Sequence, residues 1–89
     1  MIVNVGDYII LKSIEEIEED YEYIDGELKV DEISLLDEMV EEIRKNQNKP
    51  LKIIYTKPRR ISFENDGFVY PSIIVKKIVN PKDDPQYFI

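Results

Sequence analysis

The chain has 89 residues, a formal net charge of −7 and neither cysteine nor histidine. This length fits one domain with a small core, so we expect a single domain over residues 1–89 in which residues 80–89 form a C-terminal tail. Without these two residue types there is no disulfide, no thiol nucleophile, no imidazole base and no thiolate or imidazole metal ligand. The composition therefore argues against an enzyme, and we expect no cofactor.

The first segment, MIVNVGDYIILK, contains many strand-forming residues, and Gly6-Asp7 supplies a bend. This pattern predicts a strand over residues 7–12. The segment has no basic leader, and no apolar run approaches the roughly 20 residues that a bilayer-spanning helix needs. We therefore expect a cytoplasmic protein that does not contact a membrane.

The next segment, SIEEIEEDYEYIDGELKV, has two competing patterns. Apolar residues from Ile14 to Ile24 recur at helical spacing, whereas Asp25-Gly26 is typical of a two-residue hairpin turn. From residue 20 onward the hairpin is favoured, and residues 13–19 are at most a short helical turn. The turn predicts the cross-strand pairs Ile24 with Glu27, Tyr23 with Leu28, Glu22 with Lys29, and Tyr21 with Val30.

A helix is predicted at about residues 34–46, with Ser34 as its N-cap. Its apolar side chains recur at helical spacing and predict a buried face formed by Leu36, Met39, Val40 and Ile43. Its acidic side chains, Glu38, Glu41 and Glu42, fall on the opposite face. The basic pair Arg44-Lys45 suits the carboxyl end of the helix dipole.

Alternating residues from Leu51 predict a strand that ends at Lys57-Pro58. A second strand at residues 61–63 turns through Asn65-Asp66-Gly67 and returns at residues 68–70. Residues 72–79 form either a strand or a short turn followed by a strand. The predicted fold is therefore α+β: a small, strongly bent antiparallel sheet, arranged as a partly open barrel, with one inserted helix.

The order of VGDYIILKSIEEI, DEMVEEIRK, LKIIYT and ISFENDGFVYPSIIVKKI resembles that of small SH3-like barrel proteins of phages and low-GC Gram-positive bacteria. The resemblance covers most of residues 3–79 and implies an SH3-like barrel. The chain differs from that family at residues 48–50, at Tyr70 and in its additional hairpin. Because a fold does not determine a function, the resemblance assigns no site residue.

Charge is unevenly distributed along the chain. Residues 13–42 contain fourteen acidic residues and one base, Lys29, whereas residues 43–89 contain ten basic and four acidic residues. Either the two halves neutralise each other within the fold, or the surface has an acidic pole.

The stretch SIEEIEEDYEYIDGE is the candidate partner-binding surface. Its carboxylates either imitate the phosphates of a nucleic acid or form a solvated face that keeps the protein soluble. The candidate residues are Glu15, Glu16, Glu18, Glu19, Asp20, Glu22, Asp25, Glu27, Tyr21 and Tyr23.

Other candidate features are less specific. The acidic spacing does not match an EF-hand, so we expect no metal site. The basic turn Lys57-Pro58-Arg59-Arg60 is a charged turn or a partner for the acidic half, and we expect no direct binding of nucleic acid. Tyr21, Tyr23, Tyr55 and Tyr70 are candidates for a recognition surface, although half of the tyrosines are expected in the core. The ending Tyr87-Phe88-Ile89 either docks on the domain or protrudes.

From these observations we expect a non-enzymatic protein that binds a host protein which itself handles nucleic acid. The expected role is an acidic inhibitor of phage or mobile-element anti-defence type, acting in the host cytoplasm. The alternative is an adaptor or assembly module that contacts a protein through its tyrosines and C-terminal tail. Whether the chain forms homo-oligomers is left open.

Overall fold

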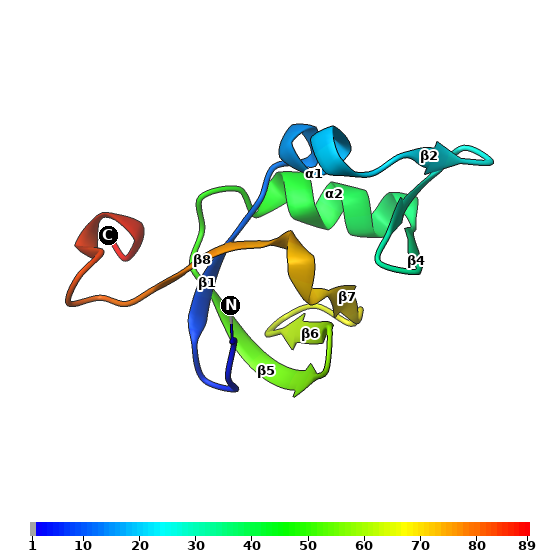
Figure 1. Cartoon of the computed structure of the whole chain (residues 1–89). Coiled ribbons are helices and arrows are strands. Elements are labelled where there is room, and N and C mark those ends of the chain that lie inside the picture. Colours follow the sequence, from blue (N-terminus) through cyan, green and yellow to red (C-terminus); the bar gives the residue numbers. More distant parts are fainter. Residues whose placement is uncertain (1) are drawn as a thin grey trace.

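The structure, a computed structural model, describes residues 2–89 (Figure 1). These residues form an α+β fold with two α-helices and two antiparallel sheets. The molecule is elongated, with extents of 43 × 24 × 23 Å. A hairpin projects from one end of it and the C-terminal residues extend from the other.

The larger sheet has the strand order β7-β6-β5-β1-β8. Its strands are β1 (Tyr8–Leu11), β5 (Leu51–Lys57), β6 (Arg60–Phe63), β7 (Tyr70–Pro71) and β8 (Val75–Val79). Register shifts at Ile10/Leu11 and Ile53/Tyr55 interrupt the ladders, as β-bulges that bend a sheet do. The sheet does not close into a barrel, because its edge strands β7 and β8 do not pair. They are instead consecutive in the chain, joined by the 3₁₀ turn η1 (Ser72–Ile74), which matches the predicted turn followed by a strand.

The smaller sheet has the order β2-β3-β4. Its strands are β2 (Tyr23–Ile24), β3 (Glu27–Val30) and β4 (Ile33–Leu35). The predicted Asp25-Gly26 hairpin is confirmed, and so are the pairs of Tyr23 with Leu28 and of Ile24 with Glu27.

Outside these two pairs the predicted hairpin is only partly formed. The Lys29 N–H donates to the Glu22 carbonyl at 3.0 Å, but the ammonium contacts Ser34 at 3.3 Å instead of pairing with the Glu22 carboxylate. The predicted pair of Tyr21 with Val30 is wrong, because Tyr21 is the residue at which the preceding helix ends.

That helix, α1 (Ile14–Asp20), corrects the prediction of a single inserted helix. It occupies the segment that was predicted to be at most a short helical turn. Two helical turns form there because the segment carries both a cap, Ser13, and a buried apolar face, Ile14 and Ile17.

Helix α2 (Asp37–Lys45) begins three residues later than predicted. Ser34 is not its cap, since Ser34 lies in β4, where it pairs with Lys29 of β3. The N-cap is Leu36, which makes no side-chain capping bond and is 46% exposed, so its predicted place on the buried face is wrong. Met39 and Ile43 are buried as predicted.

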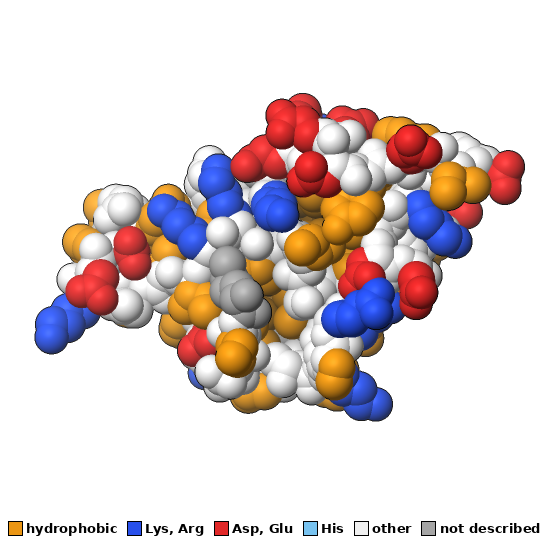
Figure 2. Space-filling model, viewed as in Figure 1, with side chains coloured by type: hydrophobic (Ala, Val, Ile, Leu, Met, Phe, Trp, Pro, Cys, Tyr) orange, Lys and Arg blue, Asp and Glu red, His pale blue; other side chains and the backbone are white. Residues whose placement is uncertain are grey.

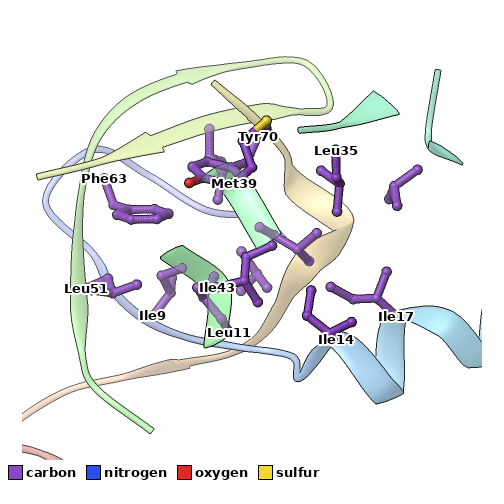
Figure 3. Packing of buried hydrophobic residues seen from close by; sticks show 14 of the residues in the cluster. Ile9, Leu11, Ile14, Ile17, Leu35, Met39, Ile43, Leu51, Phe63 and Tyr70 are labelled. Carbon is purple, nitrogen blue, oxygen red and sulfur yellow. The ribbon is translucent and has the colours of Figure 1, made fainter. Parts of the chain in front are cut away.

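The core lies between the larger sheet and the two helices (Figure 3). Ile9, Leu11, Leu51 and Phe63 come from the strands; Ile14, Ile17, Met39 and Ile43 come from the helices. Tyr70 is fully buried: its ring stacks on Phe63 with centroids 5.0 Å apart, and its hydroxyl donates to Asp66 at 2.9 Å.

The C-terminal residues pack against β1 and β8. The rings of Tyr8 and Phe88 meet edge to face with centroids 5.3 Å apart, and the Lys77 ammonium lies 4.8 Å from the Tyr87 ring centroid. Ile89 is exposed. Tyr87 and Phe88 therefore anchor the end of the chain, and of the last three side chains only that of Ile89 is exposed.

Candidate protein-binding surface

The candidate surface begins with α1, which is fixed by a capping box. The Ser13 hydroxyl accepts the Glu16 N–H at 3.1 Å, and the Glu16 carboxylate accepts the Ser13 N–H at 3.0 Å. Ile14 and Ile17 then anchor the helix in the core. Because these two residues occupy the inner face, the exposed positions are those of the remaining acids, Glu15, Glu18, Glu19 and Asp20.

A projecting hairpin continues the surface. We call residues 22–30, which comprise β2, the turn and β3, the arm (Figure 1). Asp25 and Gly26 both have positive φ, 52° and 84°, as a two-residue hairpin turn of the mirror-image type requires. The arm therefore presents three further exposed acids, Glu22, Asp25 and Glu27.

Tyr23 joins the arm to α1. Its hydroxyl donates to the Glu18 carboxylate at 2.7 Å, and this hydrogen bond is the main reason that the pKa of Tyr23 is raised. Tyr21 plays a different part, because it is half-buried against the core and its N–H donates to Ile17 at the end of α1. Of the two tyrosines predicted to bind a partner, Tyr23 lies on the surface and Tyr21 supports it.

Four carboxylates of the acidic half form ion pairs with the basic half. Glu15 pairs with Arg44 at 3.0 Å, Glu16 with Lys76 at 3.4 Å, and Glu42 with Lys45 at 4.0 Å, while Asp31 pairs with two arginines. The carboxylates of residues 13–42 that form no ion pair within residues 2–89 are Glu18, Glu19, Asp20, Glu22, Asp25, Glu27, Glu32, Asp37, Glu38 and Glu41. Both predicted arrangements of charge are thus present: the halves neutralise each other in part, and an acidic pole remains.

The paired acids of α1 have lowered pKa values. The pKa of Glu15 is lowered by a hydrogen bond from its own backbone and then by Arg44, and the pKa of Glu16 is lowered mainly by the Ser13 N–H. Both side chains are therefore ionised under all but acidic conditions, and their role in the structure is to hold α1 in place.

The basic turn at residues 57–60 holds the base of the arm. Arg59 donates two hydrogen bonds to the Asp31 carboxylate, one of them from Nε at 3.0 Å, and Arg60 contacts the same carboxylate at 3.3 Å. These arginines lower the pKa of Asp31, chiefly through the hydrogen bond from Arg59. This turn is therefore a partner for the acidic half, one of the two interpretations predicted from the sequence.

Helix α2 adds a second group of acids beside the first. It packs against α1 (Figure 1) and carries exposed Glu38 and Glu41. In the view of Figure 2, acidic side chains gather along the top of the molecule, over α1 and the arm, with basic side chains below them. The charge split along the sequence thus becomes a split across the surface.

Apolar side chains lie among the acids. Tyr23 is 55% exposed and Ile24 is 52% exposed, both on the arm. Sequence patterns missed Ile24 as a surface residue, although its position directly before a hairpin turn, opposite Glu27, was a signal for exposure. Among the other candidate tyrosines, Tyr55 is partly exposed whereas Tyr70 is in the core.

Two other kinds of feature are absent from residues 2–89. In this part of the chain no three acidic side chains come close enough together to hold a metal ion. Nor does either helix there have the length and apolarity needed to cross a membrane.

Comparison with models of known families, with curated proteins and with solved structures gave no significant match to this chain.

Proposed function

We propose that this chain is a non-enzymatic inhibitor that binds a nucleic-acid-handling protein through the acidic surface of α1 and the arm. The carboxylates take the place of a phosphate backbone in a basic site of that protein. This is the kind of protein that phages and mobile elements direct against host enzymes, and we propose that it acts in the host cytoplasm.

The observation that carries the proposal is the density of charge along α1. At about 1.5 Å per residue, its seven residues span about 10 Å. They include five acids, about one charge per 2 Å, compared with about one per 1.7 Å along duplex DNA. If Glu15 and Glu16 are counted as neutralised by their ion pairs, about one charge per 3.5 Å remains, close to the value of about 3.4 Å for one strand of the duplex.

The arm extends this line of charge beyond the helix. Glu22, Asp25 and Glu27 follow Asp20 in sequence. None of these four carboxylates forms an ion pair with a lysine or arginine among residues 2–89. The hydrogen bond from Tyr23 to Glu18 fixes the arm relative to α1. Ordering acids before binding lowers the entropic cost of docking, which favours a contact surface over a merely solvated one.

A second candidate function is an adaptor that binds a protein through apolar contacts. The exposure of Tyr23 and Ile24 favours it, since aromatic and aliphatic side chains anchor the centres of protein interfaces. Salt distinguishes the two functions: binding through exposed charges weakens as ionic strength rises, whereas apolar binding does not.

The test is capture of a partner on the immobilised full-length chain, followed by displacement with double-stranded DNA. The proposal predicts that captured proteins bind nucleic acid and are released by DNA and by 0.5 M NaCl. Partners that stay bound under both treatments would favour the adaptor.

We further propose that the larger sheet is an opened SH3-like barrel, as in the phage and bacterial proteins that the sequence resembles. In support, β1 lies between β5 and β8, and η1 connects the two edge strands directly. The smaller sheet and both helices are then an insertion between two neighbouring strands of that barrel, β1 and β5, and this insertion carries the acidic surface.

A further inference from the structure

A groove on the surface concentrates the basic residues of this acidic protein. It consists of two adjoining hollows of about 210 and 280 Å³, which share Val3 and Ser72 in their walls. Lys57, Arg59 and Arg60 line the first hollow, and Lys12 and Lys76 line the second. Five of the twelve basic residues of the chain therefore border what we call the basic groove.

Not all of this positive charge is used within the molecule. Arg59 and Arg60 pair with Asp31, and Lys76 pairs with Glu16, but within residues 2–89 neither Lys12 nor Lys57 forms an ion pair. The groove also has apolar walls, since Val3 and Pro58 contribute to it. It is therefore suited to a segment that combines acidic with apolar side chains.

The size of the hollows indicates a protein segment as the occupant. Each is smaller than the roughly 300–1,000 Å³ of a typical small-molecule site. Successive side chains of an extended strand point to opposite faces, so alternate side chains on one face of a strand can enter two adjoining hollows.

The arm has the complementary chemistry. Tyr23 and Ile24 are exposed apolar side chains, and Glu22, Asp25 and Glu27 flank them. The charges that border the groove have the opposite sign. Glu22 and Ile24 alternate along the strand and so share a face, which lets Ile24 contact the apolar walls of the groove while Glu22 meets its lysines.

The arm of a molecule cannot reach its own groove. Asp31, at the base of the arm, is tied to Arg59 and Arg60 on the rim of the groove. The Asp25-Gly26 tip lies at the other end of β3, about 20 Å away at about 3.3 Å per residue. The tip therefore points away from its own groove and is available to another molecule.

We infer that the basic groove receives the arm of a second copy of this chain. The inference rests on the arm being a contact surface, as in the proposed function, but the groove is a separate site. Because the two surfaces differ, the contact is head-to-tail and adds molecules in an open series unless the rotation closes a ring. Self-association then occupies the same arm that an external basic partner would bind.

The test uses sedimentation equilibrium of the full chain at 10–500 µM in 150 mM NaCl. At this salt concentration the repulsion between two molecules of charge −7 is screened beyond about 8 Å. The wild-type mass should rise from the monomer value of 10.6 kDa to at least twice that value as concentration increases. Raising NaCl to 0.5 M should weaken the association at least tenfold.

Two charge-reversal variants identify the surfaces. An arm variant, Glu22→Lys with Glu27→Lys, and a groove variant, Lys12→Glu with Lys57→Glu, should each remain monomeric while keeping the wild-type circular dichroism spectrum. An equimolar mixture should associate at least to a 1:1 dimer, because the arm variant retains a groove and the groove variant retains an arm.

Three results would overturn the inference: a monomeric wild type at 500 µM, association that persists in either variant, or a monomeric mixture. The proposed function is tested separately by the groove variant, which keeps its acidic arm. If it still binds the DNA-displaceable partner while the wild type is monomeric, the inference fails and the proposed function stands. If the groove variant no longer self-associates and also fails to bind the DNA-displaceable partner, the proposed function fails.

Discussion

Replacing Ile17 with alanine tests whether α1 is anchored as the structure shows. Ile17 is 2% exposed, and the substitution removes three buried carbon groups at about 0.8 kcal/mol each, or about 2.4 kcal/mol. The cavity that remains adds to this loss, so the free energy of unfolding should fall by about 2–4 kcal/mol. At about 4–8 °C per kcal/mol for a chain of this size, the melting temperature should fall by roughly 10–30 °C.

The assay is urea and thermal unfolding followed by circular dichroism, with Glu19→Ala as the matched control in the same helix. Glu19 is exposed and forms no ion pair with any of the described residues, 2–89, so its replacement should change stability by less than about 0.5 kcal/mol. A loss below about 1 kcal/mol for Ile17→Ala, or equal losses for both variants, would show that α1 does not pack on the core. The acidic surface would then lack the fixed geometry on which its proposed role depends.

Other substitutions test the cap, the core and the charges. Ser13→Ala should cost about 0.5–2 kcal/mol in urea unfolding, because it removes the capping box; no change would mean that the cap is not formed. Met39→Ala should cost about 2–4 kcal/mol and Glu38→Ala almost nothing, and equal effects would contradict the assigned faces of α2. Tyr70→Phe should cost about 1–3 kcal/mol through a lost buried hydrogen bond, whereas an unchanged midpoint would place its hydroxyl in water. The pKa of Asp31 is lowered by folding, so its stabilising effect is complete above its ordinary value of 3.8 and is lost as the pH falls through the lowered value. Asp31→Asn should therefore flatten the acid limb of a stability profile below the ordinary pKa of 3.8, and an unchanged profile would exclude this ion pair.

The sequence predicted the elements whose signals are local. Asp25-Gly26 determined both the hairpin and the register of its first two pairs, because this dipeptide strongly favours a two-residue turn. Alternation from Leu51 located β5, and helical spacing placed Met39 and Ile43 in the core.

The missed elements depended on contacts between distant residues. The turn between β3 and β4 has Asp31 and Glu32 at positive φ, 47° and 69°, without a glycine that would have signalled it. Arg59 and Arg60, 28 and 29 residues from Asp31 along the chain, hold this turn through its carboxylate. Once β4 forms, Ser34 belongs to a strand, which explains why α2 starts later than predicted.

Helix α1 was underestimated for a different reason. Its capping box, Ser13 followed by Glu16, was a local signal that could have predicted it, but the Asp25-Gly26 turn favoured a hairpin over the helical spacing of the apolar residues from Ile14 to Ile24. The structure contains both, divided at Tyr21. The ten predicted binding residues therefore lie on two joined elements, and only Tyr21 among them packs against the core.

The claim that the acids of α1 and the arm form a binding surface can be tested separately from any effect of the overall net charge. Glu19, Asp20 and Glu22 are exposed, and their carboxylates form neither ion pairs nor hydrogen bonds with other residues of the 2–89 range. Reversing all three to lysine changes the formal net charge from −7 to −1. The fold should survive, because isolated exposed charges contribute little to stability.

A control variant with the same net charge carries Glu32→Lys, Glu41→Lys and Glu64→Lys, which are exposed positions outside α1 and the arm. The measurement is the affinity of each folded variant for the captured DNA-displaceable partner at 150 mM NaCl. We predict at least a hundredfold loss for the α1 and arm variant and less than a tenfold loss for the control. Equal losses would attribute binding to overall charge, and retained binding by the α1 and arm variant would contradict the claim.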